Sequence, residues 1–284
     1  MLDPSMMQKV YNSIADAASD DCLNNKNIQE QFINSYFDWI HDTNLNKIHN
    51  LAKFSKLAYS NGTSESFDKF YLKNSNKRFR CFRGEYMYHV ATWKKNFTNW
   101  CYLDDDVIRS GDAVVMSMPF SDTGDVHPNT NAILEQCNAQ SVPVLIDCAF
   151  VGICGDIEFD LDHHCITDIT FSLSKTFPVA NIRIGMRCTK IDDDDSLFVM
   201  NKTNYTNRIG AAVGLKLLQA YSVDYNFIKW RDQQLTFCRD LNIDPSKCVV
   251  FGLGDSRYQQ YNRGMLTNRL CLANYMHQGY LPND

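Results

Sequence analysis

A lysine stands beside two serines and is followed eight residues later by an arginine in the stretch "FSLSKTFPVANIRIGMR" (171–187). Lys175 follows an apolar run, so its amine could be drawn into the interior at the end of a strand. A desolvated lysine has a lowered pKa and acts as a nucleophile towards a carbonyl. Ser172, Ser174 and Arg183 suit a phosphate. The stretch therefore indicates a ligand with a carbonyl and a phosphate, while a surface lysine after a strand is the simpler alternative.

A glycine turn precedes an amphipathic run in "SNGTSESFDKFY" (60–71). A turn that opens a helix in this way exposes free N–H groups at the positive end of the helix dipole, and this arrangement binds phosphate. Gly62, Thr63 and Ser64 are therefore phosphate candidates. The alternative is an ordinary helix start, because Thr63 or Ser64 is a natural N-cap residue.

An aspartate ends the apolar run of "PVLIDCAF" (143–150). A buried carboxylate is costly without a cationic partner, and a protonated pyridine nitrogen is such a partner. A carbonyl, a phosphate and a pyridine together describe pyridoxal phosphate, whose ring Asp147 would keep in its electron-withdrawing form. Phe150 is near enough in the sequence to line the same pocket. Alternatively, Asp147 caps the following helix.

These residues need a scaffold that brings strand ends together, and the periodicity of the chain predicts one. Apolar runs typical of strands occupy 113–118, 143–147, 168–172, 183–189, 248–254 and 268–273. Patterns typical of helices occupy 129–140, 207–222 and 226–241. The first sixty residues also read as helical, including "KIHNLAKF" (47–54). The alternation predicts an α/β sheet covered by helices, in which ligands bind at the carboxyl ends of strands.

Composition excludes several classes of function. The chain has 284 residues, 44% of them hydrophobic, and no apolar run long enough to span a membrane. Its net charge of −5 and the lack of a basic stripe argue against a nucleic-acid partner. The start "MLDPSMMQKV" shows no signal peptide, so we expect a cytoplasmic protein without membrane partners.

Neither the cysteines nor the acidic runs have the spacing of metal ligands. The eleven cysteines are scattered without a Cys-x-x-Cys pair, and we interpret them as reduced residues, several in the core. The runs at 104–106 and 192–195 are consecutive aspartates that point in different directions, which is typical of solvated loops. We therefore expect no metal site.

Taken in order, these pieces resemble the aminotransferase class I/II family of fold-type I pyridoxal-phosphate enzymes. The resemblance runs from about Tyr59 to about Ala273, most of the chain. Each motif is modest alone, but six in the correct order, with the lysine-to-arginine spacing kept, are hard to obtain by chance. The resemblance implies pyridoxal 5′-phosphate as the cofactor and Lys175 as the catalytic residue that binds it as a Schiff base. It implies that the phosphate is held by Gly62, Thr63, Ser64, Ser172, Ser174 and Arg183.

The resemblance also assigns the cofactor ring. In "GEYMYH" Tyr86 is our choice for the aromatic that stacks on it, with Tyr88 and His89 as alternatives. Asp147 would bind the ring nitrogen. Two positions depart from the family: in "MPFSDTG" and "DCAF", Ser121 replaces the asparagine and Phe150 the tyrosine that contact the ring hydroxyl. With fewer donors there, we expect a higher pKa of the cofactor's imine.

The same resemblance implies an aminotransferase that acts on amino acids and 2-oxo acids, with Arg269 in "NRLCLA" binding the α-carboxylate. Two alternatives remain open. The first is another pyridoxal-phosphate reaction, such as a lyase or decarboxylase reaction on an amino acid. The second is a catalytically degenerate binding protein, which the short chain and the two lost ring contacts favour.

The resemblance predicts a three-layer α/β/α fold with a mainly parallel sheet and a short or missing small domain. We place an N-terminal helical segment at 1–50, the cofactor-binding domain at 51–200, and C-terminal helices and strands at 201–284. The family is usually homodimeric, so we expect a homodimer. Tyr205 and Arg208 fall roughly where the family sends residues to the partner's site, although a plain loop and helix start would also explain them.

Overall fold

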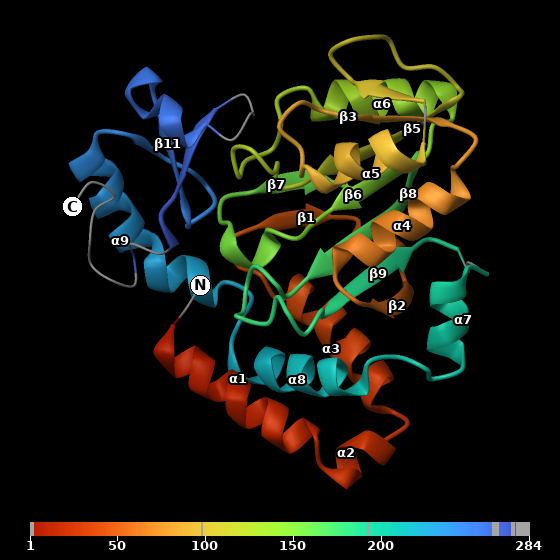
Figure 1. Ribbon diagram of the computed structural model, residues 1–284, viewed down its shortest axis with the longest axis vertical. Coiled ribbons are helices and arrows are strands. Elements are labelled where there is room, and N and C mark those ends of the chain that lie inside the picture. The colour runs from red at the N-terminus through yellow and green to blue at the C-terminus, as the bar shows by residue number, and fades with distance from the viewer. Residues whose placement is uncertain (1–2, 98, 192–193, 263–266, 274–275, 277–284) are drawn as a thin grey trace.

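The computed structural model describes residues 3–97, 99–191, 194–262, 267–273 and 276. A seven-stranded sheet forms its centre, in the order β2-β9-β8-β6-β5-β3-β4 (Figure 1). Its strands are β2 (Lys56–Ser60), β3 (Arg78–Cys81), β4 (Trp100–Tyr102), β5 (Asp112–Ser117), β6 (Val144–Asp147), β8 (Ile166–Ser172) and β9 (Gly185–Thr189). Strand β9 runs antiparallel to both neighbours, and every other pair is parallel. The prediction of a mainly parallel sheet is confirmed.

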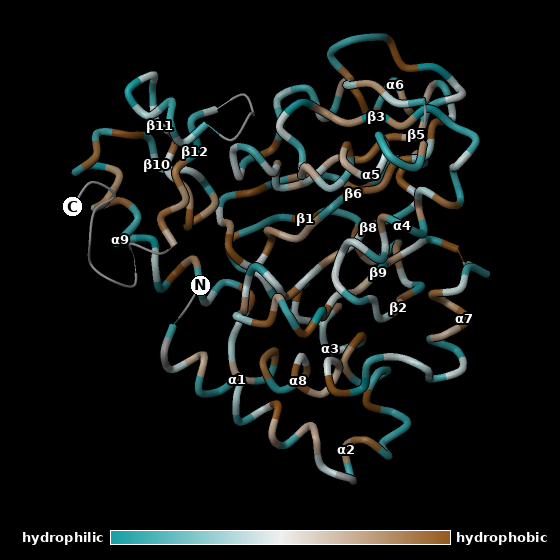
Figure 2. The backbone as a smooth tube through the Cα atoms, in the orientation of Figure 1, coloured by the Kyte–Doolittle hydropathy of each residue, from teal (hydrophilic) through white to brown (hydrophobic). Residues whose placement is uncertain are grey.

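Helices cover both faces of the central sheet. Side chains alternate between the two faces along each strand, and both faces carry apolar residues that need to be buried. Val115 and Leu145 point into a core with helices α4 (Thr63–Lys73) and α5 (Tyr88–Asn96). Val114 and Ile146 point into the larger core on the other face, with α3 (Ile28–His41), α6 (Thr130–Gln140) and α8 (Arg208–Ala220). Figure 2 shows apolar stretches along the central strands and hydrophilic loops at the rim. The predicted three-layer arrangement is therefore present.

The N-terminal segment is helical at first and then joins a second, smaller sheet. Helices α1 (Pro4–Ala17), α2 (Asp20–Asn24) and α3 pack around α8. The expectation of a helix at 47–54 is wrong: β1 (Lys47–His49) pairs in parallel with β7 (Glu158–Asp160), and only 51–53 turn as the 3-10 helix η1 (Leu51–Lys53). Ile48 lies opposite the buried Phe159, so pairing with β7 decided the structure of this short segment.

The chain ends in a small unit beside the main sheet (Figure 1). Its antiparallel sheet joins β10 (Asp244–Pro245), β11 (Phe251–Gly254) and β12 (Asn268–Cys271), and its helices are α9 (Tyr225–Leu241) and the 3-10 helix η3 (Ser256–Tyr261). Phe237, Ile243 and Leu270 share a separate apolar core. These elements lie in the part of the chain where the resemblance predicts a short small domain.

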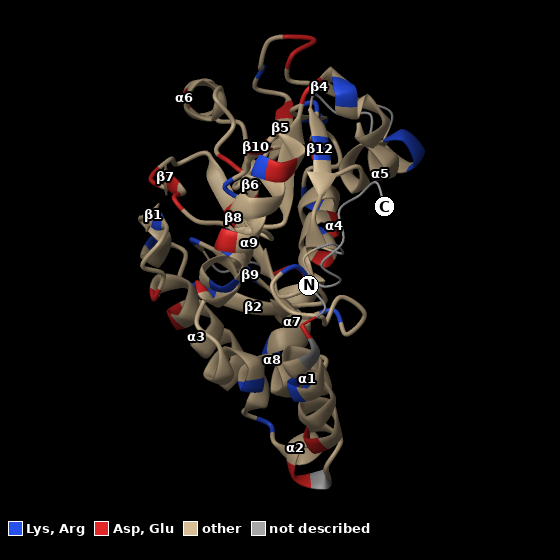
Figure 3. Cartoon of the chain, turned by 90° about the vertical axis from the view of Figure 1, so that its left-hand side faces the viewer, with Lys and Arg blue, Asp and Glu red and all other residues tan. Residues whose placement is uncertain are grey.

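Charged residues are mixed in sign over the molecule, as Figure 3 shows, but two ion pairs are buried inside the sheet. Arg80 Nη1 lies 2.8 Å from Asp112 Oδ2, and Arg187 Nε donates to Asp168 Oδ1 at 2.7 Å. Arg187 also pairs with Asp195, the N-cap of α7 (Ser196–Lys202). The sequence had suggested that the acidic run at 192–195 is a solvated loop. For Asp195 this interpretation is wrong, because the residue has a structural role.

Two searches of the described residues bear on the class of protein. None of the described helices combines the length and the apolar content that crossing a membrane requires. Across the same residues, no cluster of three or more His, Cys, Asp or Glu side chains could hold a metal ion.

All eleven cysteines lie in the described ranges as free thiols, and eight of them are buried.

Candidate active site

Three neighbouring parallel strands end in polar residues at the same edge of the sheet. Ser117 ends β5, Asp147 ends β6 and Ser172 ends β8. Ser117 and Asp147 are direct partners in the ladder, and Thr170, two residues before Ser172, is paired with Asp147. This carboxyl edge is where open α/β sheets bind their ligands, and most of the predicted site residues gather around it.

The predicted phosphate turn lies against Arg183. Gly62 is the N-cap of α4, with φ +76° and ψ 178°, and no side chain caps the first turn. The alternative of a Thr63 or Ser64 cap is therefore wrong. Arg183 Nη2 donates to Ser64 Oγ at 2.6 Å. A β-carbon at position 62 would lie 2.5 Å from that same Nη2, so the lack of a side chain at Gly62 makes the approach possible.

The end of β8 completes this phosphate cradle, which we define as Gly62, Thr63, Ser64, Ser172, Ser174 and Arg183. Ser172 Oγ and Ser174 Oγ are 2.8 Å apart, and Ser172 pairs across the sheet with Gly185. A β-carbon at Gly185 would lie 2.8 Å from the α-carbon of Gly62 and from the carbonyl oxygen of Phe171. The glycine turn and the end of β8 are therefore in close contact, although they lie more than a hundred residues apart.

Lys175 follows the cradle in the turn after β8 and is exposed. The expected desolvation of its amine is not observed, because the turn opens to solvent at the edge of the sheet. Its positive charge still acts on Asp147, where it opposes the effect of burial. The lysine therefore follows the cradle residues Ser172 and Ser174 in the sequence and is close enough to Asp147 for its charge to be felt there.

Asp147 is almost fully buried, and burial raises the pKa of its carboxyl to about 7. The N–H of Ala149 donates to Oδ1 at 3.0 Å and works in the opposite direction. The alternative role as a helix cap is wrong, since the 3-10 helix η2 (Val151–Ile153) has Phe150 as its N-cap. A carboxyl that burial leaves half-protonated near neutrality is well suited to a cationic ligand group.

The three candidates for the aromatic that stacks on the cofactor ring differ in their hydrogen bonds and in their burial. Tyr88 donates to Asp68 Oδ1 at 2.9 Å. His89 is fully buried against Tyr71, with 2.6 Å between His89 Nδ1 and the Tyr71 hydroxyl oxygen, and burial lowers its pKa to about 3. Tyr86 is 44% exposed, with its ring stacked on that of Tyr88 at 6.0 Å. Of the three, Tyr86 has the ring that is free to meet a ligand.

The small domain brings Arg269 to the two positions that depart from the family. Arg269 Nη1 donates to the carbonyl oxygen of Ser121, and its guanidinium lies 4.3 Å from the ring centre of Phe251. The ring of Phe251 is 5.6 Å from that of Phe150. The predicted carboxylate-binding arginine is therefore linked to Ser121 directly and to Phe150 through one aromatic ring.

Sequence reasoning missed Glu85, which is 6% exposed at this edge. The N–H of Ser117 donates to Glu85 Oε1 at 2.8 Å, and the Ser117 hydroxyl bonds to Oε2. Burial raises the pKa of the Glu85 carboxyl to about 8. A glutamate directly before the chosen aromatic was the available signal, but an isolated acid in a polar stretch does not reveal that it is buried.

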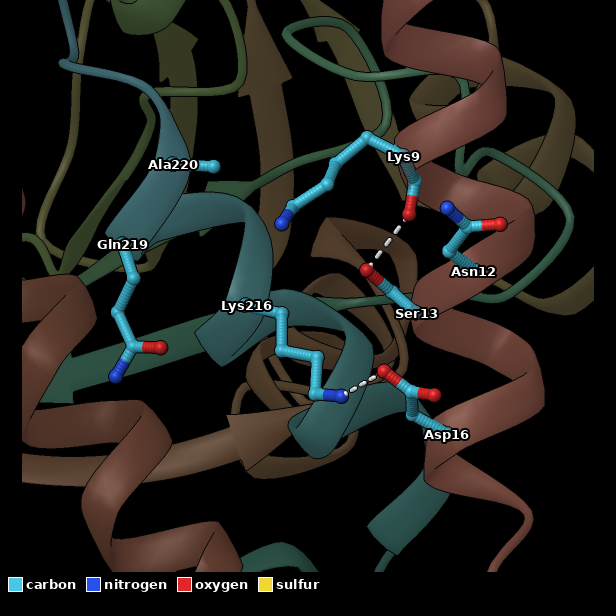
Figure 4. A pocket seen from close by; sticks show the side chains of 7 residues that line it. All are labelled: Lys9, Asn12, Ser13, Asp16, Lys216, Gln219 and Ala220. Atoms are coloured by element: carbon cyan, nitrogen blue, oxygen red, sulfur yellow. Dashed lines mark hydrogen bonds and ion pairs between the residues drawn. The ribbon is translucent and has the colours of Figure 1, made fainter.

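A surface hollow between α1 and α8 lies apart from these residues (Figure 4). Two polar contacts lie at this hollow: the Ser13 hydroxyl donates to the carbonyl oxygen of Lys9, and Lys216 pairs with Asp16. None of the predicted site residues lines it. We therefore assign it no part in the chemistry.

The residues at the sheet edge fit pyridoxal 5′-phosphate. The cradle at Gly62 is shaped by an approach that a β-carbon would block, and it offers serine hydroxyls, a guanidinium and the free amides of a helix start. A buried carboxyl at Asp147, an amine at Lys175 and an exposed aromatic ring at Tyr86 supply the kinds of group that suit a pyridine ring with an aldehyde. Fold and site together define a fold-type I pyridoxal-phosphate enzyme.

A model of the family described as "Aminotransferase class I and II" matches residues 68–242, more than half of the chain. The chain belongs to this family, whose cofactor is pyridoxal 5′-phosphate. No protein with curated annotation matches the sequence significantly.

Solved structures of low sequence identity share the fold. The histidinol-phosphate aminotransferase from Clostridium acetobutylicum is 16% identical with a TM-score of 0.58, over 88% of this chain and 78% of that one. An aminotransferase from Staphylococcus aureus is 11% identical with a TM-score of 0.65, over 96% and 88%. The pyridoxal-phosphate-bound C–S lyase from Staphylococcus hominis is 13% identical with a TM-score of 0.60, over 89% and 73%.

Proposed function

We propose that this protein is an aminotransferase that acts on an amino acid and a 2-oxo acid through Lys175. The observation that carries the proposal is the convergence of the phosphate cradle, Asp147 and Lys175 on one strand edge. Family membership supplies the cofactor, and the position of these residues at one edge of the sheet supports a role in holding it. When bound, pyridoxal phosphate supplies an electron-withdrawing ring that stabilises negative charge at the Cα of the amino acid.

The cradle binds the phosphate with complementary charge and hydrogen-bond donors. Arg183 contributes a guanidinium that can form two parallel bonds to phosphate oxygens. Ser64, Ser172 and Ser174 contribute hydroxyls, and the first amides of α4 contribute the positive end of a helix. Together they would anchor the phosphate end of the cofactor.

Asp147 and Tyr86 fix the ring. The Asp147 carboxylate would accept a hydrogen bond from a protonated ring nitrogen, and the favourable charge would offset the cost of burying the acid. Tyr86 would cover one face of the ring and exclude water from it. The Phe150 ring lines the same side of the site and offers no hydroxyl to the phenolic oxygen.

Lys175 would hold the cofactor by its amine, and the same amine would move a proton at the Cα of the amino acid as general base and then general acid. An exposed lysine in a turn has the freedom to change between these roles. Arg269 holds the α-carboxylate by a two-pronged contact that fixes which bond at Cα is presented. Amino donor and acceptor are chosen by pocket shape.

A second reaction class remains a candidate because the C–S lyase from Staphylococcus hominis has the same fold. The test is an absorption spectrum of the purified, cofactor-loaded protein with and without a panel of amino acids, followed by product analysis. Transamination gives a 2-oxo acid and a pyridoxamine form of the cofactor, whereas elimination gives ammonia. A protein that stays colourless after incubation with pyridoxal phosphate would overturn both reactions and leave a degenerate binding protein.

We further expect a cytoplasmic homodimer. Eleven free thiols suit a reducing compartment. Tyr205 is 77% exposed before α8, where a partner chain could receive it, while Arg208 donates to the carbonyl oxygen of Leu23 in its own chain. Light scattering of the purified protein measures the mass, and a monomer that is fully active would contradict a shared site.

A further inference from the structure

Glu85 is a buried acid that the resemblance assigns to no role. It lies in the turn between β3 and α5, directly before Tyr86. Both of its carboxyl oxygens are bonded to Ser117, one to the backbone N–H at 2.8 Å and the other to the hydroxyl. The Ser117 hydroxyl oxygen in turn accepts from the N–H of Ser121 at 2.8 Å. Glu85 therefore fixes the end of β5 and the start of the turn that carries Ser121.

Ser117 also places Glu85 beside Asp147. Ser117 and Asp147 are ladder partners at the ends of β5 and β6, so a carboxyl bonded to Ser117 lies next to the strand end that carries the second acid. Negative charge on Asp147 raises the pKa of Glu85 further, because like charges repel. Two buried carboxyls in this position cannot both ionise cheaply.

The groups that surround the pair leave it short of positive charge. Tyr71 on α4, Cys81 on β3 and Cys148 after β6 all interact with one of the two acids, and burial holds each of them in its neutral form by raising its pKa. Lys175 is the cation whose charge acts on Asp147. Asp122 packs against Gly84, and its carboxylate accepts from the N–H of Thr267. Among the described residues neither Glu85 nor Asp147 forms an ion pair, so their burial favours keeping a proton on one of the two acids.

We propose that Glu85 is a positioning residue for the cofactor ring: it keeps a proton at neutral pH, so that Asp147 alone is ionised against the ring nitrogen, and it adds a second negative charge there when it ionises. The proposal rests on the proposed function, because the ring nitrogen is the group that Asp147 meets. It deepens that function by giving the ring site two acids in place of one.

The two acids act differently as pH rises. Burial raises the pKa of Glu85 to about 8 and that of Asp147 to about 7, and a positive ring nitrogen opposite Asp147 favours ionisation of Asp147 first. Glu85 then ionises in the alkaline range and holds the ring proton more firmly. The ring of a bound cofactor analogue should keep its proton to a higher pH than it would with Asp147 alone.

The probe is pyridoxine 5′-phosphate, which has the ring and the phosphate but no aldehyde, so that the state of Lys175 does not interfere. Its ultraviolet spectrum reports ring protonation and is titrated when bound to the wild-type protein, to Glu85→Gln and to Glu135→Gln. Glutamine keeps the shape and one acceptor for Ser117. Glu135 is an exposed acid on α6 and serves as the matched control.

We expect Glu85→Gln to lower the pH at which the bound ring loses its proton by about one unit, and Glu135→Gln to leave it unchanged. Equal values in wild type and Glu85→Gln would overturn this inference alone. Failure of the wild-type protein to bind the probe would overturn the proposed function as well. If Glu85→Gln does not fold, infrared titration of the wild-type protein decides: loss of every protonated-carboxyl band by pH 7 contradicts the proposal.

Discussion

The guanidinium of Arg183 lies so near to Gly62 that a β-carbon at position 62 would be 2.5 Å from Nη2. Gly62 also has φ +76° and ψ 178°, a region that essentially glycine alone adopts. Two independent restraints, one steric and one conformational, therefore require glycine at the phosphate turn.

Gly62→Ala should lower the free energy of unfolding by about 1–3 kcal/mol and weaken binding of pyridoxal phosphate by displacing Arg183. Thermal unfolding and a binding titration measure the two effects. Gly111→Ala is the control, because a β-carbon there would meet no atom within 4 Å. Equal affinity for pyridoxal phosphate in both variants would show that the cradle does not bind the phosphate.

Lys175→Arg should abolish covalent attachment of the cofactor, since a guanidinium does not act as the amine nucleophile at neutral pH. Borohydride reduction followed by peptide mass analysis measures the adduct. Activity with amino acids should fall by at least about 10²-fold. Lys73→Arg, at the exposed last residue of α4, should keep both the adduct and the activity. An adduct that persists in Lys175→Arg would mean that a different lysine holds the cofactor.

Stability of the cofactor-free protein should fall as pH rises from about 5 to about 8. The pKa values of Asp147 and Glu85 are raised in the folded state to about 7 and about 8, so between their ordinary values and these the folded protein binds more protons than the unfolded chain. Raising the pH therefore favours unfolding, by at most about 1.4 kcal/mol per pH unit for each of the two carboxyls. Urea unfolding across this range measures the slope.

The slope of that pH dependence should become shallower in Asp147→Asn, because an amide has no proton to lose. The exposed Asp232→Asn on α9 is a control that should keep the wild-type slope. Below about pH 6.5 the buried His89, whose pKa is lowered to about 3, acts in the opposite direction. A wild-type protein whose stability does not fall between pH 6.5 and pH 8 would therefore show that these two carboxyls are not held protonated by burial.

Arg269→Lys should raise KM for the amino acid by about 10- to 100-fold, because one of two charge-assisted hydrogen bonds to the carboxylate is lost. Steady-state kinetics with amino acids measure it. Arg257→Lys, on the exposed helix η3, should leave KM unchanged. An unchanged KM in Arg269→Lys would mean that another group binds the carboxylate.

Phe150→Tyr should lower the pH at which the visible absorption of the bound cofactor changes, by about one unit. The restored hydroxyl donates to the phenolic oxygen of the ring and stabilises its negative charge. A spectral titration of both proteins measures the change, and Phe251→Tyr is the matched aromatic control one ring away. No difference between wild type and Phe150→Tyr would show that position 150 does not reach this oxygen.

The central strands and long helices were predictable because each carries a strong apolar period. Residues 144–147, for example, are buried on both sides, and the sequence shows them as a continuous apolar run. The order of the motifs then identified the cofactor. The helix expected at 47–54 was wrong because the partner strand is more than a hundred residues away, and no local pattern shows that pairing.

Within the site, sequence could name residues but not their environments. Tyr86, Tyr88 and His89 all follow closely after Gly84, and only the hydrogen bonds to Asp68 and Tyr71 separate them. The burial of Glu85 escaped notice because it depends on the end of β5, thirty-two residues further on. Lys175 is exposed because the turn after β8 opens to solvent. The hydrophobic periodicity of the sequence does not predict this opening.

The bond from Arg269 to the carbonyl oxygen of Ser121 has a consequence for ligand selection. The guanidinium is immobilised against the protein's own main chain before any substrate arrives, so binding costs little side-chain entropy. An incoming group must displace an uncharged oxygen, and a carboxylate is the stronger acceptor. If Arg269 binds the substrate as proposed, this bond would favour a carboxylate over uncharged groups, which are weaker acceptors.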